Sequence, residues 1–596
     1  MSRLRFYLYP LSLVSSLFGL ASLVHGEDSE ALSLLFDEYW AFETENNPFS
    51  ATLSGIHHYN DRVPDASPEA HERERATRQA FRDRLSQFER AAMSQSEAMS
   101  IEILDFILKH DIASAAFEPW RIPFVSDSGF HTTFGYVVSA TPFETEKDYR
   151  HYLKRLERLP RFLEQNRANM RLGLSEGFSQ PQAIIENLLP SFEALAEADA
   201  ETHPYTRPFR SIPETIDASI RREIEESGLR IMRKTTLPAL KELARFMRRE
   251  YLPQARKTLG AVALPEGQGY YESRVRYFTT LDDATAEKVH ETGLKEVARI
   301  RKEMETIISD LNFEGDFEAF LEFLRTDEQF YAKTAGELIM RASWVSKKAD
   351  GRLPAFFEKL PRQPYSVEAV PPELAPNYTG GRYVPASPSA SRGGRYWVNT
   401  FALDKRPLYQ LVALTLHEAV PGHHLQMSLA YEIENAPEFR KRFYPHAFGE
   451  GWGLYAEALG VEMGLYETPY DHFGRLSYEM WRACRLVVDT GIHAKGWSRQ
   501  QAVDYLASNT ALSLHEVGTE IDRYIAWPGQ ALAYKIGELA IWELRKEAEE
   551  TLGANFDIRA FHDKILEQGG LPLDALRRQV RTFIDRSSSE SQSGSN

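Results

Sequence analysis

Cysteine is almost absent from this sequence, and acidic residues outnumber basic ones. The 596 residues include a single cysteine, Cys484, so an intrachain disulfide cannot form and zinc modules built from several cysteines are excluded. Lys and Arg number 70 against 86 Asp and Glu, which gives a formal net charge of −16. Nucleic-acid binding needs clustered cations, so we expect no nucleic-acid partner. Any metal site in this chain must therefore use histidine and carboxylate ligands.

Long apolar runs are also scarce, and the clearest one lies at the N-terminus. Residues 6–24 carry no charge, follow two arginines and lead to an acceptable cleavage site before Glu27. This plan predicts a signal peptide over 1–26 and an exported protein, periplasmic or secreted, with no stable membrane association. An uncleaved N-terminal membrane anchor is the alternative. No cysteine follows the run, so we do not expect a lipoprotein.

Helical patterns dominate the rest of the chain. Residues 31–43, 149–172, 236–251 and 285–311 place apolar side chains at i, i+3 and i+4 spacing, with charged residues between them. Pro160 is expected to divide the second of these segments into two helices, because proline removes a backbone donor. The sequence therefore predicts a mainly α fold.

Strand signals are few, and the clearest covers residues 394–400. The part from Tyr396 to Thr400 could pair with an extended peptide by strand addition. Residues 361–394 contain seven prolines, four serines and four glycines, a composition that predicts a long ordered loop or a join between two halves. We expect one α-helical catalytic region over 27–585, with the halves 27–360 and 361–585. The Ser-rich segment 586–596 is predicted to be disordered.

The segment 414–426 carries the clearest chemical signal. In the common zinc-peptidase helix H-E-x-x-H, two histidines one turn apart bind zinc and the glutamate activates water. Here His417 and Glu418 are followed by Pro421 at the place of the second histidine. In a regular helix His424 would lie about 10 Å further along the axis than His417, too far to share one zinc. A bulge at Pro421-Gly422 would bring a later histidine back beside His417.

Two adjacent histidines follow this bulge, and their spacing does not choose between them. In related zinc peptidases with glycine before the second ligand, the order is Gly-His-x-Leu. The run Gly422-His423-His424-Leu425 fits that order with His423 as the ligand. His424 would then support the site or contact the substrate, and it remains the other candidate ligand.

A third ligand is expected from the run 448–457. Glu450 and Glu457 are seven residues apart and share one face of a helix. Their pattern resembles the third-ligand helix of aminopeptidase N-like enzymes, and such pairs recur in thimet-oligopeptidase-like and carboxypeptidase Taq-like enzymes. The resemblance implies that Glu450 binds zinc and Glu457 orients a ligand. A second pair, His515-Glu516, lacks a following histidine, so we expect it on a surface helix.

Four stretches together resemble the family named domain of unknown function 885. They are His417 to His424, Gly449 to Trp452, Asp489 to His493 and Tyr524 to Lys535. The family resembles gluzincin-type zinc peptidases, so membership implies a large helical fold around a deep cleft with a small β element. It also implies Zn²⁺ as the cofactor.

The last two stretches hold further candidate site residues. Gluzincins stabilise the negative charge of the transition state with zinc and a Tyr or His donor. His493, Tyr524 and Tyr534 are candidates for that donor. Arg523 and Lys535 are candidates for binding a substrate carboxylate.

These residues together predict a zinc metallopeptidase that hydrolyses short peptides, as an oligopeptidase, dipeptidase or carboxypeptidase. Glu418 would take a proton from the attacking water and pass it to the leaving amine. A zinc amidase or esterase acting on another small substrate is one alternative. A catalytically inactive, exported binding protein is the other. The oligomeric state does not follow from the sequence.

Overall fold

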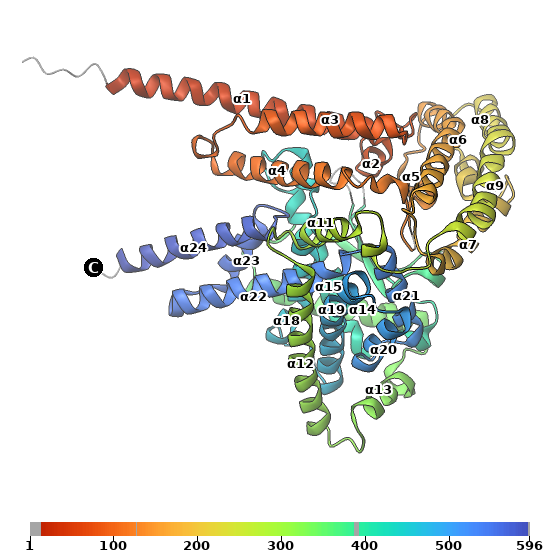
Figure 1. The fold of residues 1–596 in the computed structure, drawn as a ribbon. Coiled ribbons are helices and arrows are strands. Elements are labelled where there is room, and N and C mark those ends of the chain that lie inside the picture. Colours follow the sequence, from red (N-terminus) through yellow and green to blue (C-terminus); the bar gives the residue numbers. More distant parts are fainter. Residues whose placement is uncertain (1–13, 127, 373, 387–391, 594–596) are drawn as a thin grey trace, which may run out of the picture.

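A computed structural model describes residues 14–126, 128–372, 374–386 and 392–593 of the chain (Figure 1). Helices make up most of this part, and the strands form one small sheet, so the predicted mainly α fold is confirmed. The helices before the sheet are α1 (Val14–Asn46), α2 (Pro48–Leu53), α3 (Pro68–Leu85), α4 (Gln95–Ala115), α5 (Phe130–Ala140), α6 (Glu146–Ser175), α7 (Gln182–Glu197), α8 (Ala218–Ile231), α9 (Leu237–Phe246), α10 (Leu252–Gln254), α11 (Gly267–Thr279), α12 (Ala286–Asp310), α13 (Phe317–Thr326) and α14 (Ala335–Arg352).

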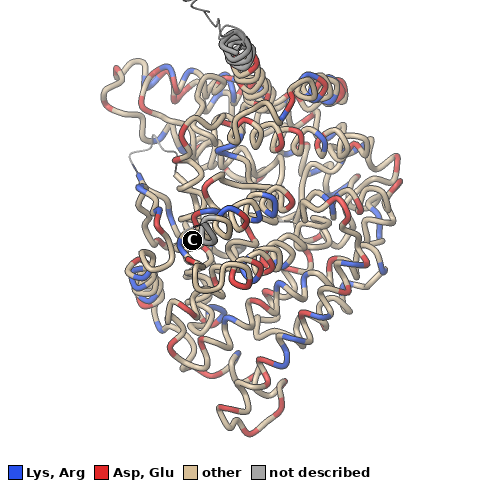
Figure 2. Tube along the Cα trace, turned by 90° about the vertical axis from the view of Figure 1, so that its left-hand side faces the viewer, with Lys and Arg blue, Asp and Glu red and all other residues tan. Residues whose placement is uncertain are grey.

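The helices after the sheet surround the candidate site. They are α15 (Leu411–Glu418), α16 (His423–Tyr431), α17 (Glu438–Arg442), α18 (His446–Glu462), α19 (Pro469–Lys495), α20 (Arg499–Asn509), α21 (Leu514–Ala526), α22 (Ala533–Leu552), α23 (Ile558–Leu566) and α24 (Leu573–Ser593). In Figure 1 the helices α1, α3 and α4 lie at the top of the molecule, above the helices that surround the candidate site, and α6 to α9 form its right-hand side. Acidic and basic residues are interspersed along the chain (Figure 2).

The predicted signal peptide falls only partly within the described residues. Residues 1–13 lie outside them, and 14–26 form the first part of α1. None of the helices in the described ranges is long and apolar enough to cross a membrane.

Two predictions about helices differ from the structure. α6 passes through Pro160 without a break, because its apolar stripe continues on both sides of the proline: Leu156, Leu159 and Leu163 are all buried. That packing outweighs the one lost backbone hydrogen bond. The tail predicted to be disordered over 586–596 is helical as far as Ser593, as the last part of α24, and residues 594–596 lie outside the described residues.

The segment predicted as a loop over 361–394 contains two strands. β1 (Tyr365–Ala369) and β2 (Gly381–Val384) flank β3 (Gly394–Val398), which gives the order β1-β3-β2. β1 runs parallel to β3, and β2 runs antiparallel to it. Because β3 is paired on both sides, the predicted addition of a substrate strand to Tyr396–Thr400 is wrong. The free edges of this sheet belong to β1 and β2.

Two helix pairs build the core beneath the site. α19 packs along α12, and its residues from Leu476 to His493 are all buried. α18 packs along α22, and α15 packs against α18. The α18–α22 crossing is close: a Cβ added to Gly537 would lie 1.8 Å from the backbone oxygen of Ala447. This crossing fixes the helix that carries Glu450.

Substitution of Gly537 tests the importance of this crossing. We expect Gly537→Ala to lower the free energy of unfolding by about 1–3 kcal/mol, because the helices must move apart. Gly135→Ala is the matched control: Gly135 also lies inside a helix, and nothing lies within 4 Å of its added Cβ. The control is expected to change stability little or to raise it slightly. Equal melting temperatures for the two variants would contradict the close crossing.

Candidate metal centre

The histidine motif spans the junction of two short helices. α15 ends at Glu418 and α16 begins at His423, so the helix stops and restarts where the sequence predicted a bulge. The His424 N–H donates to the Ala419 carbonyl across the turn at 3.1 Å. The Trp452 indole N–H of α18 donates to the Pro421 carbonyl at 2.8 Å. The turn is thus held both by its own backbone and by the neighbouring helix.

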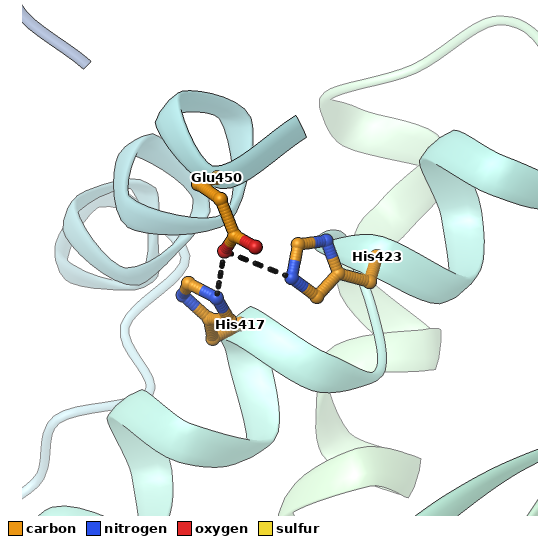
Figure 3. A group of neighbouring side chains, drawn as sticks. All are labelled: His417, His423 and Glu450. Atoms are coloured by element: carbon orange, nitrogen blue, oxygen red, sulfur yellow. Dashed lines mark ion pairs between the residues drawn. The ribbon is translucent and has the colours of Figure 1, made fainter. Parts of the chain in front are cut away.

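His417, His423 and Glu450 point toward one another across this junction (Figure 3). The Nε2 atoms of both histidines lie 3.5 Å from Glu450 Oε2. Three candidate ligand atoms, one from each residue, lie within 4.8 Å of one another. His424 points elsewhere: its Nδ1 lies 3.0 Å from the Tyr383 hydroxyl and 3.3 Å from Ser428 Oγ. Of the two candidate histidines, the geometry thus puts His423 beside His417.

α18 also shapes the setting of His417. A Cβ added to Gly453 would lie 2.6 Å from His417 Cε1, so a glycine at this position leaves room for the ring. Below the ring, Glu457 Oε1 lies 2.8 Å from His417 Nδ1 and 3.2 Å from Arg482 Nη2. Because Nδ1 is engaged, His417 presents Nε2 to Glu450. Glu457 therefore lies where the sequence predicted an orienting carboxylate.

The electrostatics of the cluster favour positive charge at its centre. Burial lowers the pKa of His417, but hydrogen bonds with Glu450 and Glu457 outweigh burial and raise it to about 10. Burial raises the pKa of Glu450, but the two histidines bring it well below its usual value. The three side chains therefore stabilise either a proton or a metal cation between them.

The donor set fits zinc. Two imidazoles and one carboxylate, with a fourth position left open, are typical of catalytic zinc sites. Tetrahedral ligands about 2.0–2.1 Å from zinc are separated by about 3.3 Å, close to the separations of 3.5 Å found here. His417 has the expected carboxylate partner at its second ring nitrogen, whereas His423 Nδ1 is buried without a partner among the described residues.

Glu418 is held by the small sheet. Its Oε2 accepts a hydrogen bond of 2.7 Å from the backbone N–H of Tyr383 in β2. The edge of β2 that is free of β3 therefore faces α15. The charge of Glu418 contributes to the raised pKa of His417, so the carboxylate acts on the cluster. The sequence did not predict this role for β2, because the segment around Tyr383 reads as a loop rich in proline and glycine.

Two of the candidate substrate or donor residues lie beside the cluster. The ring of Tyr534 stacks on His417 at an angle of 21°, with the centroids 6.4 Å apart. Arg523 Nη2 donates to the Tyr534 hydroxyl at 3.3 Å and to Gln530 Oε1 at 2.7 Å. Arg523 also lies 3.5 Å from Glu520, so its guanidinium is already engaged.

Three other candidates are occupied by structural contacts. His493 is buried, with Nδ1 accepting from the Ala261 N–H at 3.0 Å and Nε2 lying 2.9 Å from the Tyr524 carbonyl. The Tyr524 hydroxyl accepts from Trp481 and Arg485 and donates to Glu520. Lys535 Nζ lies 2.6–3.1 Å from three glutamates, Glu296, Glu479 and Glu538. The polar atoms of His493, Tyr524 and Lys535 are thus engaged in contacts within the fold, and the structure gives no support to the predicted catalytic roles of the first two or to the predicted substrate role of Lys535.

Sequence analysis missed two aromatic residues at the start of α18 that lie beside His423: Tyr444, two residues before the helix, and His446, its first residue. Together with Phe278 and Trp527, which contact His446, they form an aromatic wall beside the candidate site. Burial and the Glu450 carboxylate raise the pKa of Tyr444, whose ring lies 6.1 Å from that of His423. The His446 ring lies 5.6 Å from Tyr444, and burial lowers its pKa to about 4. Neither residue belongs to a spaced motif, so only the fold reveals them. His515, in contrast, is exposed in the first turn of α21, as the sequence predicted.

The same fold occurs in two solved bacterial structures. A "putative lipoprotein" from Colwellia psychrerythraea is 26% identical, with a TM-score of 0.88 over 94% of this chain and 100% of that one. A "putative lipoprotein of unknown function" from Shewanella oneidensis is 18% identical, with a TM-score of 0.72 over 92% and 99% of the two chains. At that identity the second likeness concerns the fold alone. None of the curated proteins compared with this chain matches it.

The family comparison covers the region that holds the candidate metal centre. Residues 48–580 match the family described as "Bacterial protein of unknown function (DUF885)". This span runs from α2 into α24 and includes all four stretches that carried the resemblance in the sequence. The chain therefore belongs to the DUF885 family of bacterial proteins.

Proposed function

We propose that this protein is an exported zinc metallopeptidase of the gluzincin type that hydrolyses short peptides. The observation that carries the proposal is the convergence of His417, His423 and Glu450 beside Glu418, which has no ion pair among the described residues. If His417, His423 and Glu450 only stabilised the fold, a further carboxylate without an ion pair would have no reason to lie beside them. Export is supported by the N-terminal pattern and by the "putative lipoprotein" descriptions of the structural relatives.

Each residue of the cluster has a separate role in this proposal. His417, His423 and Glu450 would hold zinc, which supplies Lewis-acid polarisation and lowers the pKa of water. Glu418 takes the proton of the attacking water and delivers it to the leaving amine. Glu457 keeps His417 in the tautomer that presents Nε2. The Tyr534 hydroxyl, next to Arg523, is the donor best placed to stabilise negative charge on the scissile carbonyl oxygen.

Burial of the site favours short substrates. The exposed fractions are 3% for His417, 8% for His423 and 9% for Glu418. A folded protein surface cannot bring its backbone to such buried side chains, whereas a short extended peptide can. Peptides of a few residues are therefore the proposed substrates.

Metal analysis of two neighbouring histidine variants tests the ligand set. We expect one zinc per chain in the wild type and in His424→Ala, and almost none in His423→Ala, because only His423 faces Glu450. Zinc at 100 times its dissociation constant should stabilise the folded wild type by about 2.7 kcal/mol, seen as a higher melting temperature. Mass spectrometry of the metals gives the stoichiometry. The ligand assignment is wrong if His424→Ala loses zinc and His423→Ala keeps it.

Substitution of Glu418 tests the proposed base. Glu418→Gln should keep one zinc per chain but lose peptide hydrolysis by about 10²–10⁴-fold, because the amide cannot accept the proton. Glu434→Gln removes the same charge at an exposed position and is expected to behave like the wild type. Cleavage of a peptide library, followed by mass spectrometry with and without chelator, measures both. Full activity of Glu418→Gln would refute this role, and cleavage of esters or other amides but no peptides would favour a different hydrolase.

A further inference from the structure

A half-buried arginine without a partner lies near the metal centre. Arg274 of α11 makes no hydrogen bond or ion pair with any residue that the structure describes, and its Nε is buried. Its guanidinium carbon lies 4.6 Å from the ring centroid of Phe278 and 5.2 Å from that of Tyr277. Stacking on rings positions the cation but leaves its donors unused. A buried donor without a partner costs about 1–3 kcal/mol, so a ligand that bonds to it would bind favourably.

A short chain of ring contacts leads from Arg274 to the metal ligands. Phe278, under the guanidinium, lies 5.1 Å from the His446 ring. His446 lies 5.6 Å from Tyr444, and Tyr444 lies 6.1 Å from His423. Arg274 therefore belongs to the same aromatic wall as the metal centre.

The loop before α22 links Arg274 to the other side of the site. A Cβ added to Gly529 would lie 3.2 Å from the Arg274 backbone, so this loop packs directly on α11. Trp527 of the same loop lies 6.1 Å from Phe278 and 5.9 Å from His446. Gln530 accepts from Arg523, which contacts Tyr534 above His417. The charges of Arg274 and Arg523 both lower the pKa of His446, as expected for two cations on one wall.

The other cations near the site are already neutralised. Arg523 lies 3.5 Å from Glu520, and Lys535 lies among three glutamates. Arg482 is paired with Glu457 behind His417. Arg274 has no such ion pair among the described residues; burial raises the pKa of Asp111 and the charge of Arg274 opposes that rise, but the donors of its guanidinium stay free for an anion.

We propose that Arg274 forms a carboxylate-binding subsite of the metal centre and that its ligand is the C-terminal carboxylate of a short peptide. This inference rests on the proposed peptidase function and specifies its substrate class. A guanidinium matches a carboxylate with two parallel hydrogen bonds, and the rings of Phe278 and Tyr277 cover one face of the guanidinium. Every unmodified short peptide carries this anion near its last peptide bond. The protein would therefore remove residues from the C-terminal end, as a carboxypeptidase or dipeptidase does.

Two matched peptide libraries test the subsite. One is a tripeptide library of random sequence with free C-terminal carboxylates, and the other is the same library as C-terminal amides. We expect the wild type to cleave the free acids about 10–100-fold faster than the amides, and Arg274→Gln to lose this preference by slowing only the free acids. Arg276→Gln, which removes a cation two residues further along α11, should keep the preference. Equal slowing of both libraries by Arg274→Gln, or no preference in the wild type, overturns the proposal.

A binding measurement separates this inference from the proposed function. Glu418→Gln protein dialysed against the two libraries should retain free acids over amides, and Glu418→Gln/Arg274→Gln should not. Retention without any cleavage by the wild type would support the subsite and contradict the peptidase. Cleavage without selective retention would do the reverse. Selective retention of amidated peptides that contain Asp or Glu would keep the carboxylate subsite but assign it to acidic side chains.

Discussion

The contact between the Glu450 carboxylate and two imidazoles is the interaction on which this architecture depends. Three titratable groups are gathered where water has little access, and a carboxylate in such a place requires compensating charge. That charge comes from the imidazoles: the neighbouring glutamates raise the pKa of His417, and the two histidines lower the pKa of Glu450. Two features of the helices position these side chains. The break between α15 and α16 turns His423 toward His417, and the close α18–α22 crossing fixes the helix that carries Glu450.

Residues of the most distinctive motifs do not all take part in chemistry. Buried Asp489 accepts from the Gly529 N–H and from the Tyr271 hydroxyl, and so ties α19 to the loop before α22 and to α11. Lys535 neutralises a group of glutamates between α12, α19 and α22. These contacts fix the loop between α21 and α22, and with it the helix ends that carry Arg523 and Tyr534. A motif can therefore be specific because it builds the support of a site.

Sequence reasoning reached the residues that converge in the candidate metal centre but not their surroundings. Two short segments hold these residues: His417, Glu418 and His423 in the first, and Glu450 and Glu457 in the second. Within a segment, the spacing of residues predicts which side chains share a helix face, so local sequence was sufficient. Arg274, Tyr383 and Tyr444 come from separate elements that only the fold unites. The contacts that engage His493, Tyr524 and Lys535 come from partners distant in the chain, and such engagement leaves no trace in the sequence. The helical stripes gave the fold class correctly, whereas Pro160 and the strands in 361–394 show that tertiary packing overrides local propensity.

Anomalous diffraction at the zinc edge from crystals of the zinc-loaded protein tests the central claim most directly. The account predicts one strong peak about 2 Å from His417 Nε2, His423 Nε2 and a Glu450 oxygen. A zinc peak at any other group of residues, or no peak between these three side chains at saturating zinc, would contradict it.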